Sequence, residues 1–474
     1  MTALSEVPVA PASPERFRAL LGDDYGAVEH AVERAKAVLA GRVVWHLNST
    51  ARGGGVAEML QSLLAYASGA GVAVRWMTIG GSPDFFRITK RIHNHLHGAA
   101  GDGGPLGDRE RVLYEQALAT SGGELAGLVR EGDIVYLHDP QTVGMIPALK
   151  AAGVRVVWRC HVGLDNPNDL ARQAWEFLRP YAAEADACVF SRRAFSWDGL
   201  DEDRLWIVAP SIDAFSPKNQ DMDPAVVDAI VARVGLMDAD HAVAAPVFTR
   251  QDGSQGTVDR GAELDQEQPI TPEAPLVVQV SRWDRLKDPE GVLRAFAERV
   301  SHPDVHLLLA GPSVADVADD PEGAEVLAQV RAQLAALPAQ VRARAHLACL
   351  PMDDVDENAA MVNALQRRAD IVLQKSLAEG FGLTVAEGMW KARPVIASRI
   401  GGIQDQIVDG KTGLLIDDPA DLEATGRAID GLLDDPDRAR AIGVAARESV
   451  RASFLGTRHL IQYMELLERM LDGD

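Results

Sequence analysis

The sequence predicts an α/β protein with two doubly wound domains in tandem, each built on a mostly parallel sheet with helices on both faces. Three observations lead to this prediction. The chain has 474 residues, a length that suits about two or three domains. Apolar residues make up 47% of it, which is ample for large cores. Short β-rich runs alternate with helical stretches along most of the chain, which is the pattern of βα units.

The first domain is expected to span residues 1–212. Its strands are predicted where β-branched and aromatic residues concentrate, at 42–48, 72–79, 133–139, 154–161, 187–191 and 205–210. Helical patterns, for example 56–71 and 174–185, lie between these strands. The alternation makes a parallel sheet the natural arrangement, because each strand needs a crossover before the next.

The second domain is expected to span residues 213–455, followed by an amphipathic helix over 456–474. Its strands are predicted at 276–283, 305–311, 345–351, 370–376, 393–398 and 412–417. Residues 237–275 are polar, rich in glycine and proline and weakly periodic, so we expect an ordered or mobile insertion near the domain boundary. A ligand of two such domains should lie at the carboxyl ends of the strands, in the cleft where the domains meet.

Charge and cysteine content narrow the classes of function. The formal net charge of −22 argues against nucleic acid or an anionic membrane as the main partner, but not against a small anionic ligand. The three cysteines are far apart and lie in apolar surroundings, as expected for reduced thiols of a cytoplasmic protein. The first residues lack the basic start and apolar core of a signal peptide, and no run of about 20 apolar residues predicts a membrane span.

The first candidate motif is the glycine run Gly53, Gly54 and Gly55, between the strand at 42–48 and the helix at 56–71. Glycine loses the most backbone freedom on folding, so a run of three needs a reason. Either the turn requires positive φ, or a ligand approaches the backbone. Exposed N–H groups at a helix start suit a diphosphate, but the run matches no common phosphate-binding pattern. Both interpretations stay open from the motif alone.

The second motif is the segment SRWDRLKD, which follows the first strand of the second domain. It places Arg282 and Lys287 at the carboxyl end of that strand. A guanidinium and a flexible ammonium group can neutralise a diphosphate that departs as a leaving group. The alternative is a pair of surface cations in a loop.

The third motif is SLAEGFGLTVAEGMW, in which Glu379 and Glu387 are separated by seven residues. Glu379 is expected to project from a loop after a strand, and Glu387 from the helix that follows. Carboxylates accept hydrogen bonds from sugar hydroxyls, and backbone amides of the loop can donate to the same sugar. These amides belong to Gly380, Phe381, Gly382 and Leu383.

Polar residues of the first domain are candidates for binding an acceptor. His161 follows an apolar strand and precedes a polar loop, which places it at the expected cleft; the alternative is a core histidine. Five further residues can bind glucose hydroxyls: Lys90, His93, Asn94, Asp139 and Gln141. For the first three, the alternative is a helix C-terminal turn with cations near the negative end of the dipole.

A metal site is not expected. The aspartate pairs at 221–223, 238–240 and 354–356 have the DxD spacing. In the first pair Asp223 is followed by Pro224, which is the start of a helix rather than a metal ligand. The other two pairs are expected in loops without a preceding strand.

Together these features resemble the family 4 retaining glycosyltransferases of the GT-B type, and the resemblance covers nearly the whole chain. It rests on the glycine run at 53–55, His161, the segment SRWDRLK and the pair Glu379 and Glu387. The resemblance implies two Rossmann-like domains that face each other across a cleft and bind a nucleotide sugar. It also implies that no metal or other cofactor is needed, and that the last helix packs back on the first domain.

The resemblance also implies roles for single residues. Arg282 and Lys287 would bind the donor diphosphate, and Glu379 with the amides after it would hold the donor sugar. Glu387 would bind the ribose hydroxyls. His161 would lie beside the reacting carbon and the 6-hydroxyl of the donor sugar. Catalysis is thus expected from His161, Arg282, Lys287 and Glu379.

Several stretches resemble, within that family, the members that form trehalose. They are VWHLNSTARGGGVAEML, RWMTIGGSPDFFRITKRIHNHLHG, HDPQ, WRCHVGLDNPN and SIDAFSPKN. These members move glucose reversibly from a nucleoside diphosphate glucose (the ADP, UDP or GDP form) to free glucose. The diphosphate leaves while the acceptor attacks from the same face, so no protein nucleophile is needed.

Three alternatives remain at this point. In the first, the acceptor is phosphorylated, as in glucose 6-phosphate, and Arg87, Lys90 and Arg91 provide its basic pocket. In the second, the protein is a GT-B epimerase. In the third, it is a sensor of sugar nucleotides without activity. The nucleotide, the favoured direction and the oligomeric state are also open, with a homodimer as one possibility.

Overall fold

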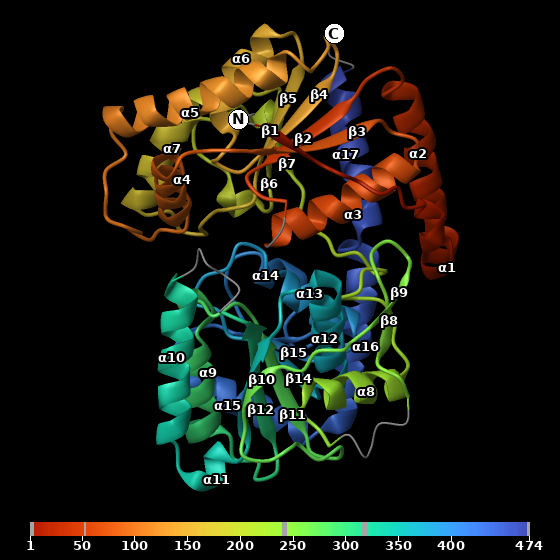
Figure 1. Ribbon diagram of the computed structural model, residues 1–474, viewed down its shortest axis with the longest axis vertical. Helices are drawn as coiled ribbons and strands as arrows, with labels where there is room; N and C mark the ends of the chain where they lie inside the picture. Colours follow the sequence, from red (N-terminus) through yellow and green to blue (C-terminus); the bar gives the residue numbers. More distant parts are fainter. Residues whose placement is uncertain (1–3, 52–53, 239–243, 315–320, 472–474) are drawn as a thin grey trace. The chain divides into compact units, whose positions relative to one another are not determined.

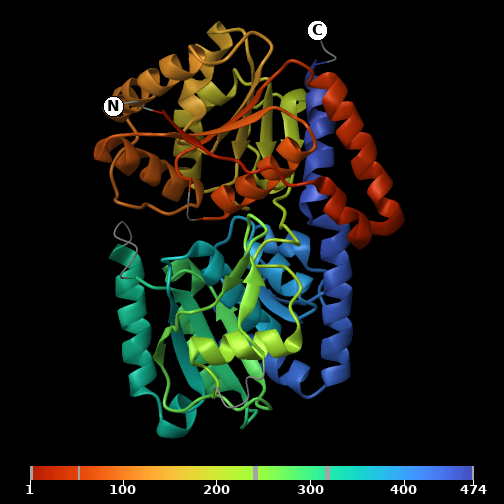
Figure 2. The same cartoon turned by 45° about the vertical axis from the view of Figure 1, so that its right-hand side comes forward.

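The structure is a computed structural model and describes residues 4–51, 54–238, 244–314 and 321–471. The chain divides into two compact units. The first unit consists of residues 1–211 together with 454–474, and the second consists of residues 212–453. In Figures 1 and 2 the colours from red to yellow, with the last blue helix, mark the first unit; green to blue mark the second.

The first unit contains a seven-stranded sheet with the order β1-β3-β2-β4-β5-β6-β7. The six predicted strands are confirmed and pair in parallel. β1 was not predicted and pairs antiparallel with β3 at the edge, with Leu4 opposite Ile79. The strands are β1 (Leu4–Val7), β2 (Val44–Asn48), β3 (Val74–Ile79), β4 (Ile134–His138), β5 (Arg155–Cys160), β6 (Ala187–Phe190) and β7 (Leu205–Ile207).

Helices cover both faces of this sheet, which explains why central strands such as β4 are buried at every residue. One face packs on α4 (Pro83–Leu96), α5 (Asp108–Ala126), α6 (Ile146–Ala151) and α7 (Asp169–Ala182). The other packs on α2 (Tyr25–Val38), α3 (Gly55–Gly69) and α17 (Gly456–Leu471). The short helix α1 (Arg18–Leu21) precedes α2. α17 is thus part of the first unit, where Met464 and Leu467 share a core with Tyr136.

The second unit also contains a seven-stranded sheet, with the order β10-β13-β12-β11-β14-β15-β16. Its six predicted strands are confirmed and parallel. The strands are β10 (Glu263–Asp265), β11 (Leu276–Val280), β12 (His306–Pro312), β13 (Ala345–Leu350), β14 (Ile371–Gln374), β15 (Val395–Ser398) and β16 (Leu414–Ile416).

Helices lie on both faces of the second sheet as well (Figure 1). One core cluster joins one face to α9 (Pro289–Arg299), α10 (Pro321–Ala336) and α15 (Leu422–Leu433). The other face contacts α12 (Val355–Arg368) and α13 (Leu383–Trp390). The remaining helices are α8 (Pro224–Val234), α11 (Ala339–Arg342), α14 (Ile403–Gln406) and α16 (Pro436–Ser453). The expected class, two doubly wound α/β sheets, is confirmed.

The predicted insertion is built into the second unit through the part of it that the structure describes. It contains a hairpin of β8 (Val247–Thr249) and β9 (Gln255–Thr257), and it supplies β10, which pairs antiparallel with β13. The buried carboxylate of Glu357 on α12 accepts the backbone N–H groups of Asp259 and Arg260 at 2.7 and 2.8 Å. It also binds the Arg260 guanidinium. These contacts fix the chain on α12, so the insertion is ordered here.

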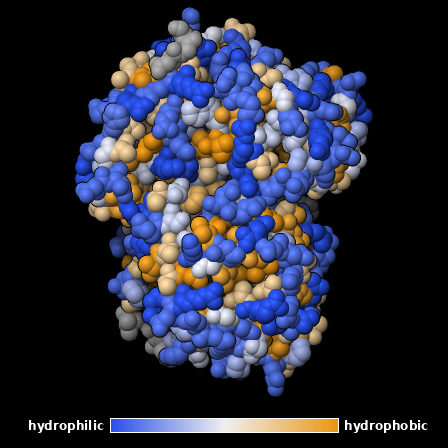
Figure 3. All heavy atoms as spheres, turned by 180° about the vertical axis from the view of Figure 1, so that it is seen from behind, coloured by the Kyte–Doolittle hydropathy of each residue, from blue (hydrophilic) through white to orange (hydrophobic). Residues whose placement is uncertain are grey.

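Much of the face drawn in Figure 3 is hydrophilic, and the three cysteines are buried. On the face drawn in Figure 3, hydrophilic side chains predominate and hydrophobic ones form smaller groups between them. Cys160, Cys188 and Cys349 are free and buried. Burial raises the pKa of all three thiols. No helix within the described ranges is long and apolar enough to cross a membrane.

Candidate functional site

The topology of each sheet marks one place for a ligand. In the second unit the order of the parallel strands reverses between β11 and β14, and in the first unit it reverses between β2 and β4. Open α/β sheets bind ligands beyond the carboxyl ends of the strands at such a switch point. The loops after these four strands carry most of the residues that the sequence singled out.

The second unit brings Lys287 and Glu379 together at its switch point. Lys287 ends a short 3-10 turn, Arg285–Lys287, after β11, and Glu379 lies in the loop after β14. The Lys287 ammonium group forms an ion pair with the Glu379 carboxylate. Their side chains are 18% and 12% exposed, so a ligand can still reach the pair. Two residues that the sequence assigned to phosphate and sugar therefore contact each other directly.

Hydrogen bonds between the two loops hold this pair in place. The Gln279 amide on β11 donates to the Lys287 carbonyl at 2.9 Å and accepts from the Lys375 N–H at 3.2 Å. The Leu377 N–H donates to the Leu286 carbonyl at 2.7 Å. One buried amide side chain thus connects the two strand ends.

Arg282 is oriented differently from Lys287. Its side chain is 58% exposed, and its guanidinium donates to Asp284 at 2.7 Å. Asp284 also caps the 3-10 turn by accepting the Leu286 N–H at 2.8 Å. The second predicted cation is therefore attached to the loop that presents Lys287.

Sequence reasoning missed Lys375, which is a further cation beside Lys287 and Arg282. Its side chain is 1% exposed and forms an ion pair with Asp288, the N-cap of α9. Asp288 has a positive φ of 50° and follows Lys287 directly. Lys375 lies at the end of a predicted strand, and a lysine at such a position is usually an exposed terminal residue. Its signal would have been a charged residue inside an otherwise apolar run.

Glycines shape the loop that carries Glu379. Gly382 has a φ of 82° and is the N-cap of α13, whose first residue is Leu383. A Cβ atom on Gly401 would lie 1.8 Å from the Glu379 carbonyl oxygen, and the Gly402 N–H donates to the Gly380 carbonyl at 2.9 Å. Two backbones thus pack together without side chains between them.

A buried amide side chain also holds this loop in place. The Gln406 side chain donates to the Phe381 carbonyl at 2.6 Å. The Phe381 side chain is itself buried. The same amide lies 3.3 Å from the Gly382 carbonyl, so the loop has a defined backbone conformation between Glu379 and α13.

Glu387 lies on α13 and is almost fully buried. Its Oε2 atom has no hydrogen-bond partner among the described residues, and its Oε1 lies 3.8 Å from the Lys218 ammonium nitrogen. Lys218 is a residue that the motif search did not single out. A buried carboxylate oxygen without a donor is suited to a ligand hydroxyl.

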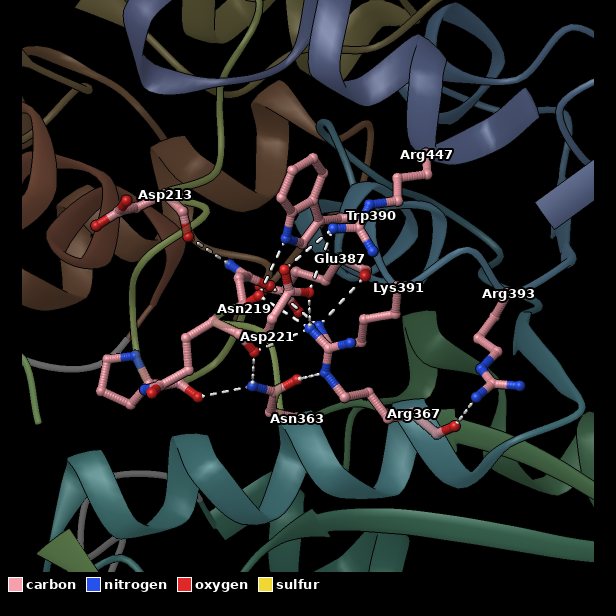
Figure 4. Close-up of polar contacts among 12 residues, drawn as sticks. Asp213, Asn219, Asp221, Asn363, Arg367, Glu387, Trp390, Lys391, Arg393 and Arg447 are labelled. Atoms are coloured by element: carbon pink, nitrogen blue, oxygen red, sulfur yellow. Dashed lines mark hydrogen bonds and ion pairs between the residues drawn. The ribbon is translucent and has the colours of Figure 1, made fainter. Parts of the chain in front are cut away.

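The segment that carries Lys218 is anchored by the polar cluster in Figure 4. The Trp390 indole donates to the Asn219 carbonyl at 3.0 Å, and the Lys391 amine donates to the Asn219 side chain at 3.0 Å. Asn363 on α12 donates to the carbonyls of Pro217 and Gln220 at 3.0 and 2.9 Å. Burial lowers the pKa of Lys391 well below its ordinary value. The cluster explains how Lys218 is positioned beside Glu387.

In the first unit, the backbone conformation of Gly54 explains part of the glycine run. Gly54 has a φ of 86° and a ψ of 155° and is the N-cap of α3, which begins at Gly55. Only glycine adopts this conformation readily, so the turn itself requires Gly54. A Cβ atom there would meet nothing within 4 Å among the residues that the structure describes. Gly53 lies outside the described residues.

Asp139 and His161 follow neighbouring strands of the first unit, β4 and β5. Asp139 has a positive φ of 62°, and its carboxylate accepts the backbone N–H of His161 at 2.8 Å. Burial raises the pKa of Asp139 to about 7. The structure thus joins a predicted acceptor residue to the predicted catalytic histidine.

His161 is also the end of a row of imidazoles. Its Nε2 lies 3.1 Å from Nδ1 of His138, and Nε2 of His138 lies 3.1 Å from Nδ1 of His46. Burial lowers the pKa of all three rings, that of His46 to about 3. His46 and His138 were not singled out, because a histidine inside a strand carries no local signal of its partners.

The other predicted acceptor residues lie on two elements. Lys90, His93 and Asn94 belong to the C-terminal half of α4, where Lys90 is exposed and the other two are half-buried. The His93 ring packs edge-on against that of His97, the C-cap, at 4.9 Å. Gln141 follows Asp139 in the loop after β4.

Two of the three aspartate pairs contain helix caps. Asp223 caps α8 by accepting the Ala225 N–H at 2.9 Å, as predicted. The expectation of a loop without a preceding strand was wrong for residues 354–356. β13 precedes them, and Asp354 caps α12 and pairs with Arg250 at 2.7 Å. The pair at 238–240 falls partly on residues 239–243, which lie outside the described ranges.

Family models match both units of the chain. Residues 46–197 match the model described as trehalose synthase, N-terminal domain, and residues 262–449 match that of glycosyl transferases group 1. The chain is 36% identical over 457 residues to a trehalose synthase of Rubrobacter xylanophilus, covering 94% of each chain. It is 32% identical to a trehalose synthase of Pyrococcus horikoshii, covering 96% of each.

Solved structures share the fold. One of them is an alpha,alpha-trehalose-phosphate synthase (UDP-forming) from Burkholderia vietnamiensis, with a TM-score of 0.65 and 14% identity. The match covers 91% of this chain and 98% of that one. At this identity the likeness concerns the fold alone.

Proposed function

The chain belongs to the trehalose synthase family and is a glycosyltransferase of the GT-B fold; from this premise we propose that it transfers glucose, with retention, from a nucleoside diphosphate glucose to free glucose. The product of this reversible transfer is trehalose. The proposal goes beyond the trehalose-related glycosyltransferase activity that the family establishes, because it specifies donor, acceptor and stereochemistry.

The observation that carries the proposal is the ion pair between Lys287 and Glu379 at the switch point of the second unit. A nucleotide sugar offers both an anionic diphosphate and neutral hydroxyls. Lys287 can turn from the carboxylate to the diphosphate, and Glu379 is then left to accept from the sugar hydroxyls. The ligand thus replaces one ion pair by two charge-assisted sets of hydrogen bonds.

The neighbouring groups complete a donor site in this proposal. Arg282 adds a second positive charge for the diphosphate, and the amides of the loop from Gly380 to Leu383 donate to the sugar. The Oε2 atom of Glu387 accepts from a ribose hydroxyl. On the first unit, a Cβ on Gly54 would meet nothing within 4 Å among the described residues, so the backbone there is open to an anion, and Gly55 begins the helix that follows.

The chemistry then needs little from the protein beyond position and charge. The bond from the anomeric carbon to the diphosphate oxygen breaks, and Arg282 and Lys287 stabilise the charge on that oxygen. The acceptor hydroxyl forms the new bond on the same face, and its proton passes to the departing phosphate oxygen. Atoms and charges balance without a protein nucleophile. His161 contacts the 6-hydroxyl of the donor sugar.

Free glucose is favoured over glucose 6-phosphate as the acceptor. A phosphate would need the cations of α4, but Arg91 is buried and donates to Asp102 at 2.6 Å. Arg87 and Lys90 are both exposed, and Arg87 pairs with Asp84 at 3.0 Å. Four other residues offer hydrogen-bonding groups that suit sugar hydroxyls: Asp139, Gln141, His93 and Asn94.

The test is a product assay with matched variants. The protein is incubated with ADP-, UDP- or GDP-glucose and with glucose or glucose 6-phosphate, and products are separated by chromatography. We expect trehalose, and a loss of about a hundredfold in kcat/KM in Lys287→Ala and in Glu379→Ala. Arg285→Ala is the control, because Arg285 lies in the same turn but pairs outward with Glu325 at 2.7 Å. Near-normal turnover in both variants would contradict the assignment.

A further inference from the structure

Three strands of the first unit place their histidines in one continuous row. His46 ends the row on β2, His138 is its centre on β4, and His161 follows β5. The ring centroids are 5.4 and 5.5 Å apart, and the planes of successive rings differ by 25° and 16°. Each of the two contacts joins an Nδ1 to an Nε2 at 3.1 Å. The rings are therefore linked by a pair of hydrogen bonds in series.

The number of protons on the three rings limits the arrangements that the row can adopt. A neutral imidazole has one N–H and one lone pair. Three neutral rings hold three protons, and two of them occupy the two contacts. The third proton sits at one end, either on Nδ1 of His161 or on Nε2 of His46. The row therefore has two arrangements, and in each of them the three tautomers are determined together.

The surroundings keep the rings neutral. The titratable and charged groups around the row are Asp139 after β4, Arg159 on β5, Tyr136 on β4, and His459 and Tyr463 on α17. Arg159 is fully buried and lowers the pKa of all three histidines, as does desolvation. Asp139 engages the backbone N–H of His161 rather than its ring.

The two ends of the row face different environments. His161 is half-buried at the carboxyl edge of the sheet. His46 lines a cavity of about 90 Å³ whose walls are mainly apolar side chains of α2, α3 and α17. Tyr136 lines it too, and its hydroxyl is buried without a partner among the described residues. Burial raises the pKa of Tyr136, so this hydroxyl keeps its proton.

These environments favour one arrangement. An N–H on Nε2 of His46 would face mainly apolar walls, where a buried donor is costly, whereas an N–H on Nδ1 of His161 lies at the half-buried end of the row, where water or a ligand can accept it. With Nε2 of His46 bare, its Nδ1–H donates to His138, and the Nδ1–H of His138 donates to His161. The remaining proton is then on Nδ1 of His161, which points away from the row.

We propose that His46 and His138 are positioning residues for glucosyl transfer, because they keep the proton of the neutral His161 ring on Nδ1 as a hydrogen-bond donor to the donor sugar. This inference rests on the proposed function for the identity of the sugar. His46 acts from two strands away and touches no reacting atom. Its effect is transmitted only through the tautomer of His138.

The experiment compares three variants of the full chain. His138→Phe removes the partner of His161 but keeps an aromatic ring. His138→Asn restores a side-chain amide at the place of Nδ1, from which it can donate to His161. His46→Phe cuts the row at its far end and preserves the ring that stacks on Tyr136 at 4.6 Å. Val72→Ala changes the wall of the same cavity without touching the row and is the control.

The first measurement is the pH profile of kcat. We expect the wild type, His138→Asn and Val72→Ala to change less than twofold between pH 8 and pH 5.5. His138→Phe removes the hydrogen bond that the neutral His161 ring accepts at Nε2, so the pKa of His161 rises although burial and Arg159 still lower it, and we expect kcat of this variant to fall by more than about twofold between pH 8 and pH 5.5. A purely structural role would lower kcat by the same factor at both pH values, which would overturn the proposal.

The second measurement does not depend on activity. Long-range ¹H–¹⁵N spectra of the protein without ligand report which nitrogen of each histidine is protonated. We expect the Nδ1–H form of His161 in the wild type and averaged shifts for two tautomers in His46→Phe. An unchanged His161 spectrum in both His46→Phe and His138→Phe would refute the row. If the wild type makes no trehalose while these spectra change as expected, the proposed function fails and the row stands.

Discussion

Replacing Gly401 by alanine is the most direct way to move the Glu379 loop without touching a polar side chain. An alanine Cβ at this position would lie 1.8 Å from the Glu379 carbonyl oxygen and 2.9 Å from its carbon. Gly401 also has a φ of 47°, in the left-handed region. Both neighbouring atoms belong to backbone, so no rotation of a side chain relieves the clash.

The size of the expected displacement follows from these distances. A Cβ atom essentially never approaches a heavy atom within 3.0 Å, so the oxygen and the Cβ must separate by at least about 3.0 − 1.8 = 1.2 Å. Misplacing a positioning group by about 1 Å can cost on the order of a hundredfold in rate. We therefore expect kcat/KM for the nucleotide sugar to fall by about a hundredfold in Gly401→Ala.

A second glycine provides the control for backbone strain. Gly410 has a φ of 73°, and a Cβ on it would meet nothing within 4 Å. Alanine at either position loses about 1–2 kcal/mol to its left-handed conformation, but only at 401 does it displace the Glu379 loop. The assay is initial-rate kinetics with varied donor, together with thermal unfolding of both variants. If Gly401→Ala and Gly410→Ala differ less than twofold in kcat/KM, the reasoning is wrong.

Two further predictions concern stability. Glu357→Ala removes the acceptor of two backbone N–H groups that fix the insertion, at about 1–3 kcal/mol each, so we expect the free energy of unfolding in urea to fall by roughly 2–6 kcal/mol. Asp353→Ala, which removes an exposed carboxylate 3.7 Å from Arg260, should change it by less than about 1 kcal/mol, and equal losses would contradict the role of Glu357. Burial raises the pKa of Asp139 from 3.8 to about 7, so the ionised carboxylate lowers the stability of the folded protein. This loss of stability grows between about pH 4 and pH 7 and is constant above pH 7. Asp139→Asn should therefore gain stability relative to the wild type at pH 8 but not at pH 4, and a difference independent of pH in urea midpoints would argue against a buried ionised carboxylate.

The parallel strands were predictable because each is a compact apolar run. β4, β5 and β13 are buried at all or nearly all residues, and such runs stand out against the helices between them. β1 and β10 were missed for the opposite reason. They have four and three residues, include acidic side chains, and form only because a distant strand edge pairs with them. Three or four residues are too few for a period of two to be recognised.

The candidate site shows the same division between local and distant information. Lys287 and Glu379 were each predicted from a motif, but their ion pair joins residues 92 positions apart in the chain. Lys218 was missed because its place beside Glu387 depends on the anchoring of Asn219, which no local pattern shows. His46 and His138 were missed because the contact between them links two different strands. Motifs indicated chemical types, and the strand order determined their partners.

The short antiparallel strands have a consequence for engineering this protein. β1 and β10 each cover the outer edge of a parallel sheet, and Glu263 and Asp265 of β10 pair with Arg331 at 2.6 and 2.8 Å. An uncovered edge offers free N–H and C=O groups to a strand of another molecule. The segment at 237–275, which carries none of the site motifs, shields the six-residue apolar strand β13. Shortening it would invite intermolecular strand addition, so aggregation would appear before any loss of catalytic groups.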